Sequence, residues 1–364
     1  MNIFNHVCGC SVPRLELPVR TLPFARFRSP AIDVSYTLPM ARRDPLATRI
    51  AALEAQAKTD IPPPLSDLVT ALEHKSSLVV AAAGKVVKSH RLETLIPRVI
   101  SALDQFYTAE DPQCRAKLSL LQALCDMDQT TVDICQRAVR HVQMEAVWGG
   151  RQDSAGPLRI LGLGGLVALG SQEIYALIAD LLADPLAEVR GAAARVAGQV
   201  GGERPALLLR LRLHLGDAAE PANLGDYAAG YLACAGDGGV PLVAGFLERA
   251  DRLTTGPLVL ALGESRLATA LPVLTELLER RWGLVPDGDL LTAIALHRSE
   301  GAARCLLEIL DGEDRTRARR AALELRLYRE RSEVVEEVRR ILQRWPELRE
   351  ILADFFEQNP ASAT

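Results

Sequence analysis

Residues 140–159, RHVQMEAVWGGRQDSAGPLR, contain the side chains of this sequence that are best suited to recognition. A tryptophan stands there among basic and acidic residues in a polar run that contains two adjacent glycines. Tryptophan and arginine are enriched among the residues that dominate binding energy at protein interfaces. We therefore predict a partner-binding site formed by Arg140, His141, Glu145, Trp148, Arg151, Asp153 and Arg159. In the alternative interpretation, Trp148 packs beneath a loop and the charged groups are simply solvated.

A second group of cations occupies similar places in successive parts of the chain: Arg115, Arg159, Arg190 and Arg319, with Lys117 and Arg317 nearby. In a stacked repeat protein, equivalent positions would form a ladder along one surface. Guanidinium groups bind carboxylates and phosphates through paired hydrogen bonds, so such a ladder predicts an acidic peptide partner. The alternative is ion pairing between repeats, for which the candidate acids are Asp111, Asp184, Glu188 and Asp314.

Patterns typical of enzymes and metal proteins are missing from the sequence. The seven cysteines include no C-x-x-C pair and no cysteine–histidine group at zinc spacing. The glycine-rich run at residues 162–170 has Val167 where a dinucleotide-binding loop needs its third glycine. We predict no catalytic residues, no metal and no cofactor. The odd, dispersed cysteine count is typical of a reducing compartment and favours a cytoplasmic protein.

The helices that would position these residues are easiest to recognise at residues 184–202, DPLAEVRGAAARVAGQVGG. Asp184 and Pro185 predict a helix start, and the glycines at 201 and 202 predict its end. Between them one narrow apolar face is expected at Val189, Ala192, Ala193 and Val196. Pro205 would open a second helix with a broader apolar stripe at Leu207, Leu208, Leu211 and Leu215.

The turn between two such helices recurs along the chain, at residues 88–91, 126–129, 170–173, 201–204, 236–239, 263–266, 297–300 and 329–332. The steps run from 27 residues (236 to 263) to 44 residues (126 to 170). Periods in this range are typical of solenoid proteins. Strand-like alternation of β-branched residues is missing, which argues against propellers and β-helices.

Four units carry a resemblance to a known family: DPLAEVRGAAARVAGQVG, DPQCRAKLSLLQAL, GPLVLALGESRLATALPVLTELLE and DRTRARRAALELRLYRERSEVVEEV. They resemble HEAT repeats of the short bacterial type over about residues 65–345. The resemblance implies an all-α fold, an α-solenoid of about eight HEAT-like helical hairpins. Proteins with such repeats serve as adaptors, as nucleic-acid-binding enzymes and as bilin-attaching lyases, so the resemblance leaves function open.

The expected organisation has four parts. Residues 1–44 form a tail rich in proline and arginine that we expect to be disordered, and residues 45–64 form a helix followed by a proline linker. The repeat array spans residues 65–345 with a loop insertion at 146–157, and residues 346–358 form a C-terminal capping helix. A net charge of −4 and a pI near 6.0 argue against a general nucleic-acid binder. Unbroken apolar runs of membrane-spanning length are also missing, so no membrane role is expected.

These observations favour a non-enzymatic scaffold that binds a protein or an acidic peptide. Two alternatives follow from the resemblance: a HEAT-like bilin lyase or lyase subunit, and a DNA-binding repair glycosylase. The glycosylase would need a basic groove. The densest arginine cluster (Arg315, Arg317, Arg319 and Arg320) is diluted by nearby acids at 313, 314 and 324.

Overall fold

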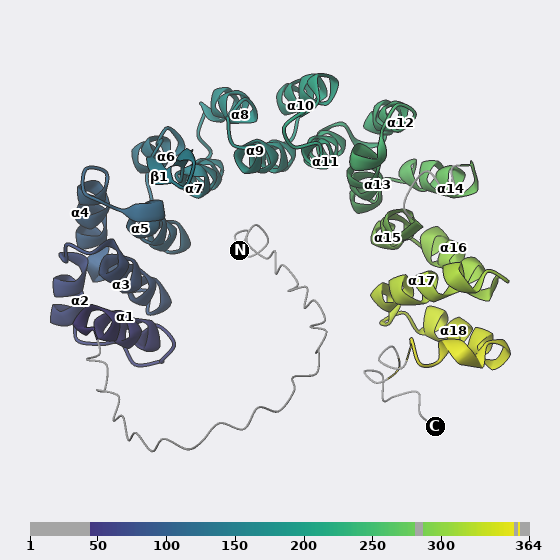
Figure 1. Cartoon of the computed structure of the whole chain (residues 1–364), viewed down its shortest axis with the longest axis horizontal. Helices are drawn as coiled ribbons and strands as arrows, with labels where there is room; N and C mark the ends of the chain where they lie inside the picture. The colour runs from purple at the N-terminus through teal and green to yellow at the C-terminus, as the bar shows by residue number, and fades with distance from the viewer. Residues whose placement is uncertain (1–43, 281–286, 353–355, 357–364) are drawn as a thin grey trace, which may run out of the picture. The chain divides into compact units, whose positions relative to one another are not determined.

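The computed structural model describes residues 44–280, 287–352 and 356, and it is all-α apart from one short β-hairpin (Figure 1). The tail expected at residues 1–44 lies outside the described residues except for its last residue, Asp44. Contacts between Cα atoms divide the chain into two compact units, residues 1–129 and residues 130–364.

The first unit consists of helices that surround α3. Its elements are α1 (Pro45–Gln56), α2 (Leu65–Leu72), α3 (Ser77–Ser89), α4 (Ile96–Phe106) and α5 (Arg115–Asp126), with 3₁₀ turns at Glu93–Leu95 and Pro112–Cys114. Helix α3 contacts α1, α2, α4 and α5. Its small side chains are suited to that position, since valines and alanines from Val79 to Val87 are buried. The three prolines at 62–64 separate α1 from α2, as the sequence predicts for a linker.

The second unit begins with α6 (Val132–Val139), the strands β1 (Met144–Val147) and β2 (Gly150–Asp153), and α7 (Gly156–Ala168). Helical pairs follow: α8 (Ile174–Leu182), α9 (Ala187–Val200), α10 (Glu203–Leu215), α11 (Asn223–Ala235), α12 (Val240–Leu247), α13 (Arg252–Ser265), α14 (Ala270–Arg280), α15 (Asp287–His297), α16 (Glu300–Asp311), α17 (Arg315–Leu325) and α18 (Ser332–Arg344). Short 3₁₀ turns occupy Gly236–Gly239, Arg326–Tyr328 and Pro346–Leu348.

The helices of the second unit form two rows. In the first row, α7, α9, α11, α13, α15 and α17 contact one another in sequence order. The even-numbered helices from α8 to α16 form the second row. Each packs on the first-row helices before and after it in sequence, except α12, which packs on α13 and on the 3₁₀ turn Gly236–Gly239. Figure 1 shows the second row lying along one side of the first. Each helix therefore buries one face against a partner that is close in sequence.

Helix α9 matches the sequence prediction closely. The four residues of the expected apolar face, from Val189 to Val196, are all buried. Gly201 and Gly202 follow the helix with φ angles of 69° and 88°, a conformation that favours glycine. The helix begins later than expected, at Ala187, because the Asp184 carboxylate caps the preceding turn by accepting a hydrogen bond from the Leu186 N–H at 2.8 Å.

The apolar stripe predicted for α10 is not the face that the structure buries, so this prediction is wrong. Leu209 and Leu213 are buried against the first row, whereas Leu207, Leu211 and Leu215 are exposed. The reason is the pattern LLLRLRLHL, in which leucine occupies every second position from 207 to 215. Two residues turn a helix by about 200°, so alternate leucines divide between opposite faces. The sequence alone does not show which face is buried.

First-row helices approach closely where glycine replaces a side chain. A Cβ atom added at Gly198 of α9 would come within 2.8 Å of the Cα atom of Gly230 on α11. A Cβ atom at Gly230 would meet the carbonyl oxygen of Ala194. These contacts bring the two backbones together, and a larger residue would force them apart.

Two further features bear on the sequence predictions. Pro346–Leu348 forms a 3₁₀ turn where the C-terminal capping helix should begin, and half of its remaining residues, 353–355 and 357–358, lie outside the described parts of the chain. The run Asn223–Leu247 has the length and composition of a possible membrane span. In the structure it comprises α11 and α12, with Gly236 between them at φ 59°, and α11 packs between α9 and α13.

The close approach of α9 and α11 can be tested by adding a single methyl group. We expect Gly230→Ala to lower the free energy of unfolding by about 1–3 kcal/mol, because the methyl group overlaps the α9 backbone. Gly245→Ala in α12 is the matched control, since a Cβ atom there meets nothing within 4 Å, and it should leave stability unchanged or raise it by up to ~1 kcal/mol. Urea unfolding measures both, and equal effects would contradict the packing described.

Candidate functional site

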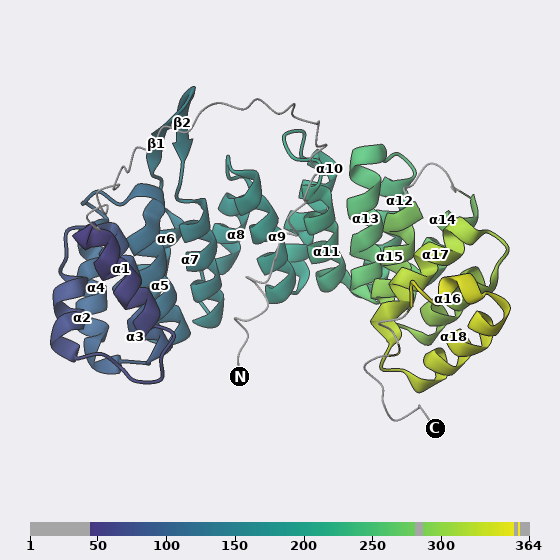
Figure 2. The ribbon, with the colours of Figure 1, turned by 60° about the horizontal axis from the view of Figure 1, so that its bottom comes forward.

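Residues 144–153 form an antiparallel β-hairpin where the sequence predicts a loop. Met144 pairs with Asp153 and Val147 pairs with Gly150, which leaves Trp148 and Gly149 as a two-residue turn. Gly149 has a φ of 91° and Trp148 is not among the residues of positive φ, a pattern typical of the second central position of a type II turn, which favours glycine. Figure 2 shows β1 and β2 projecting beyond the ends of α6 and α7.

Trp148 lies at the tip of this hairpin with its side chain fully exposed, at 104% of its reference area. The alternative in which it packs beneath a loop is therefore wrong. Its exposed apolar neighbours are Val142, Met144 and Val147. Val142 precedes β1, and Met144 and Val147 point to opposite faces of the hairpin, so these side chains do not form one patch. Isolated exposed aliphatic residues are ordinary, whereas a fully exposed tryptophan is the kind of residue found at interaction sites.

The base of the hairpin is held by Asp153. Its carboxylate accepts hydrogen bonds from the backbone N–H groups of Gln143 and Ala155, both at 3.0 Å, and from Arg159 at 2.7 Å. Burial raises the pKa of Asp153, but these hydrogen bonds outweigh burial and hold the pKa below its usual 3.8. The group is ionised at neutral pH and joins both strands to α7.

Arg159 extends this connection into the helical part of the unit. Its side chain is buried, forms an ion pair with Asp184 at 2.9 Å, and donates to the carbonyl oxygen of His141 at 2.9 Å. The same guanidinium therefore contacts the start of the hairpin, its end and the loop before α9. The hairpin is attached to a fixed support, although its tip is free in solvent.

The two faces of the hairpin differ in chemistry. Met144, Ala146 and Arg151 share one face by register, and the Arg151 guanidinium donates to the Met144 carbonyl oxygen at 3.0 Å. On the other face, the Glu145 carboxylate accepts hydrogen bonds from Gln143 and Ser154, both at 2.6 Å. Arg140 lies outside the hairpin, at the end of α6, and pairs with Glu173 at 3.5 Å.

Six of the ten predicted site residues are thus brought together at the hairpin and its base, and Arg140 lies before it at the end of α6. The other three lie elsewhere: Arg115, Lys117 and Arg190. Arg115 is exposed on the first unit and donates two hydrogen bonds to the Gln113 side-chain oxygen, at 2.8 and 3.2 Å. Lys117 is almost fully buried, where it pairs with Asp111 at 3.2 Å and donates to the Phe106 carbonyl oxygen at 3.0 Å.

The predicted ladder of cations is not a continuous exposed row. Lys117, Arg159 and Arg190 are buried and bonded within the chain, so they do not present their charges to a partner. For these three, the structure agrees with the alternative of internal ion pairing. Asp111 and Asp184 act as two of the acids expected in that alternative, but the partner of Arg190 is Asp217, which the sequence analysis did not identify.

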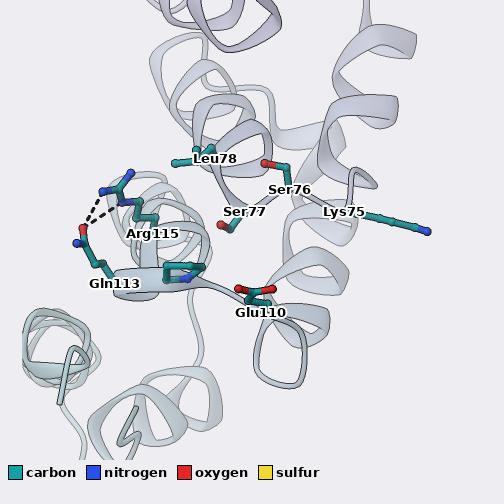
Figure 3. A pocket seen from close by; sticks show the side chains of 8 residues that line it. Lys75, Ser76, Ser77, Leu78, Glu110, Gln113 and Arg115 are labelled. Carbon is teal, nitrogen blue, oxygen red and sulfur yellow. Dashed lines mark hydrogen bonds between the residues drawn. The ribbon is translucent and has the colours of Figure 1, made fainter. Parts of the chain in front are cut away.

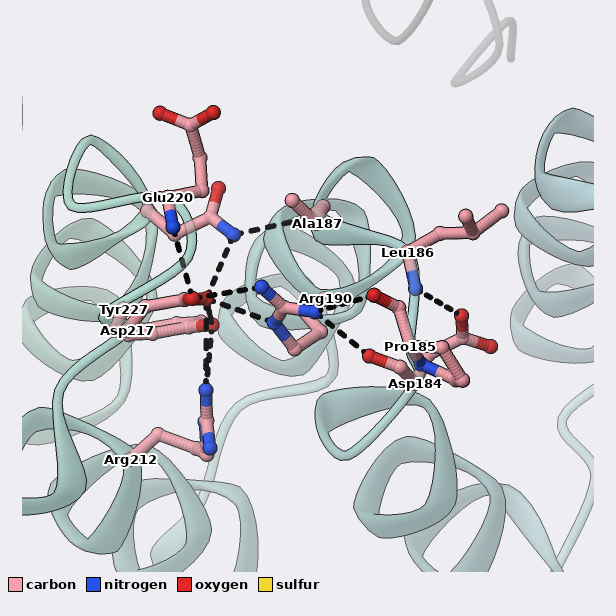
Figure 4. A network of polar contacts seen from close by, with 10 residues as sticks. Asp184, Pro185, Leu186, Ala187, Arg190, Arg212, Asp217, Glu220 and Tyr227 are labelled. Atoms are coloured by element: carbon pink, nitrogen blue, oxygen red, sulfur yellow. Dashed lines mark hydrogen bonds and ion pairs between the residues drawn. The ribbon is translucent and has the colours of Figure 1, made fainter. Parts of the chain in front are cut away.

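Asp217 is the centre of a buried polar network (Figure 4). It receives two hydrogen bonds from Arg190, both at 2.7 Å, one from the Tyr227 hydroxyl at 2.7 Å and one from Asn223 at 3.0 Å. Arg190 also donates to the carbonyl oxygens of Asp184 and Pro185, at 2.8 and 2.9 Å. Burial raises the pKa of Asp217, but the bonds from Arg190, Tyr227 and Asn223 hold that pKa well below its usual 3.8.

An open cleft in the first unit lies around the start of α3 and has a volume of about 330 Å³ (Figure 3). It is lined by Lys75, Ser76, Ser77, Leu78, Glu110, Pro112, Gln113 and Arg115. In Figure 3 the Lys75 side chain points away from the other lining residues, and Arg115 is bonded to Gln113. Among the hydrogen bonds of these lining residues, none joins a serine hydroxyl to a base.

Comparisons with known proteins assign no family. No family model matches the chain, and no curated protein matches it. Among solved structures, one engineered protein is similar at 16% identity, with a TM-score of 0.35, over 88% of this chain and 93% of the other. A similarity at that level carries no argument about function or about the kind of repeat.

The Asp217 network predicts a specific dependence of stability on pH. Because the folded-state pKa lies below the ordinary carboxyl value, the stabilisation is complete above about pH 4 and is lost as the pH falls. We expect Asp217→Ala to lower the free energy of unfolding by about 3–5 kcal/mol at pH 7, because Arg190 is left buried without its acid.

Urea unfolding at pH 7 and pH 3 measures this effect. Asp180→Ala, at an exposed position on α8, is the control and should change stability little at either pH. The loss caused by Asp217→Ala should become smaller at pH 3. A loss that is equal at both pH values would show that the carboxylate charge contributes nothing to the network.

Proposed function

We propose that this chain is a non-enzymatic protein-binding scaffold in which the β1–β2 hairpin binds the partner. The observation that carries the proposal is the full exposure of Trp148 at the tip of a hairpin whose base is fixed. A tryptophan side chain contributes a large contact area with few rotatable bonds, which makes it effective at the centre of an interface. While the Trp148 side chain is exposed to solvent, its contact area contributes nothing to the stability of the fold.

The support beneath the hairpin strengthens this interpretation. Asp153 bonds both ends of the hairpin and Arg159, and Arg159 bonds Asp184 in turn. A binding element held in one geometry before it meets its partner loses less conformational entropy on binding. We infer a partner with an apolar cavity for Trp148 and an acidic group within reach of Arg151, which lies on the same hairpin.

The scaffold that carries the hairpin is, in our proposal, an α-solenoid of HEAT-like repeats. Successive pairwise contacts in the first row support it, and so does a recurring polar pair six residues apart. An aspartate before a first-row helix or α5 bonds a residue six positions later in four places: Asp111 and Lys117, Asp153 and Arg159, Asp184 and Arg190, and Asp217 and Asn223. In the Asp184 pair the bond is made by the backbone carbonyl.

A cytoplasmic location without membrane attachment remains part of this proposal, on the cysteine and hydropathy patterns of the sequence. The bilin-lyase and glycosylase alternatives remain predictions. No observation on the described residues favours either of them. In the arginine cluster of α17, Arg315 stacks on Trp345, Arg317 pairs with Asp314, and Arg320 also has an interaction partner, so at least three of its four members are engaged within the chain.

The proposal predicts that one side chain controls partner capture. Affinity capture from the native cell, followed by mass spectrometry, should recover a protein with the wild type that is lost with Trp148→Ala. Truncating a central tryptophan anchor costs about 2 kcal/mol or more of binding free energy, which is about thirtyfold in affinity. Arg151→Glu should also weaken capture, and because it places two negative charges opposite each other, added salt should partly restore binding by screening the repulsion.

The matched control is Ile61→Ala, because Ile61 is also a large, exposed apolar residue but lies between α1 and α2. It should capture the same protein as the wild type, and all variants should keep the same helical circular dichroism. Identical capture by wild type and Trp148→Ala would refute the role of the hairpin. Trp148-dependent flotation with phospholipid vesicles, without any protein partner, would replace the scaffold with a membrane-binding role.

A further inference from the structure

Helix α10 has two apolar faces, and the fold uses only one of them. Leu209 and Leu213 are buried against the neighbouring helices. On the other face, Leu207, Leu211 and Leu215 follow one another at intervals of four residues and are 61%, 55% and 65% exposed. Residues at that spacing lie one above the other on a helix. Three leucines therefore form an exposed stripe along the length of α10.

An exposed apolar stripe is unusual on a helix that packs in a row, because exposed leucines add little to folding stability. A second-row helix needs one apolar face for the core and a polar face for solvent. Fully burying the side chain of one leucine contributes about 1.5–3 kcal/mol, and each of the three has only part of this contribution in the folded chain. A continuous apolar stripe with no role in the core is the pattern expected of a docking surface for another helix.

The charges beside the stripe show what kind of partner fits. Arg204, Arg210 and His214 are exposed on the same side of α10 as the leucines. Arg204 lies over the Tyr175 ring of α8 at 5.2 Å, and the His214 ring meets the Phe246 ring of α12 edge-on at 5.2 Å. Arg210 has no ion pair with any of the described residues. Glu203, four residues before Leu207, is the one acidic residue of α10, so the border of the stripe is mainly basic, and neighbouring helices hold it in place at two points.

We propose that the exposed stripe of α10 is a second docking site, which binds an amphipathic helix with acidic residues beside its apolar face. The leucines would insert between the apolar residues of that helix, and its carboxylates would pair with Arg204 and Arg210. This site is separate from the β1–β2 hairpin and does not depend on the function proposed for it.

A second copy of this chain fits the stripe less well. Two copies of α10 paired antiparallel about Leu211 would bring their Arg210 side chains near each other. Like charges at such a crossing oppose association, and no acidic residue of α10 other than Glu203 at its start is available to offset them. The charge pattern therefore favours an acidic partner over self-association.

The test uses a fluorescein-labelled helical peptide with leucine on one face and glutamate beside it, and fluorescence anisotropy measures its binding to the full-length chain. We expect saturable binding that weakens as salt is added. Leu211→Asp should weaken binding by about tenfold or more, because it places a carboxylate against the acidic helix and removes the central apolar contact. Arg210→Glu should weaken it through charge alone.

Two controls make the result specific. Leu253→Asp changes another exposed leucine, at the start of α13, and should bind the peptide as the wild type does. Trp148→Ala should also bind it normally, which separates this site from the hairpin. A version of the peptide with lysine in place of glutamate should bind far more weakly.

Three outcomes would overturn the proposal. They are equal binding of the lysine and glutamate peptides, an equal loss for Leu211→Asp and Leu253→Asp, and concentration-dependent dimerisation of the wild type that Leu211→Asp abolishes. The last would show, by sedimentation velocity, that the stripe joins two copies of this chain. Thermal unfolding of each variant, expected within a few degrees of the wild type, confirms that the fold is intact.

Discussion

The second unit depends most on buried arginines, each of which pairs with aspartates in the loops before its own helix and before the next first-row helix. Arg159 contacts Asp153 before α7 and Asp184 before α9, and Arg190 contacts the backbone of Asp184 and then Asp217 before α11. Each guanidinium therefore fixes the spacing of two successive helical pairs. The helices it joins meet through alanine and glycine, which pack closely but specify register poorly. Directional charge-assisted bonds supply that specificity, which is the best-attested use of buried ion pairs.

The fold could be predicted from the sequence where local spacing decides which residues are buried, and not where distant residues decide it. The four-residue apolar face of α9 has a single helical period, so its burial followed directly from spacing. Helix α10 has leucine at every second position, and a period of two in a helix supplies two equivalent faces. The positions of the neighbouring helices decide which of the two faces is buried. Those positions cannot be read from the sequence of α10 itself. Asp217 was missed for a similar reason: it stands 27 residues after Arg190, in a loop without a recognisable motif.

For the candidate site, too, the sequence predicted some features and missed others. Composition was enough to select residues 140–159 as a candidate, because tryptophan, arginine and acidic residues are concentrated where the repeat is interrupted. The hairpin itself was not predicted, since its strands are four residues long and carry no regular alternation of apolar and polar residues. Arg159 was identified correctly as part of this region, but its role is the opposite of an exposed contact. Arg159 is buried and contacts oxygen atoms of His141, Asp153 and Asp184, so it supports the base of the hairpin.

The hairpin and the α10 stripe place their apolar surface in solvent by different means, and this difference separates their expected modes of binding. Trp148 projects from the fold on a two-residue turn, so it can enter a cavity in a partner, with its position set by the polar contacts of Asp153. The leucines of α10 lie along a helix that is itself packed in a row, so they offer a long, shallow surface rather than a projection. A projecting aromatic side chain suits a concave partner, whereas a stripe suits a second helix. If both proposals hold, the two surfaces would bind their partners by different modes, a projection entering a cavity and a stripe packing on a helix.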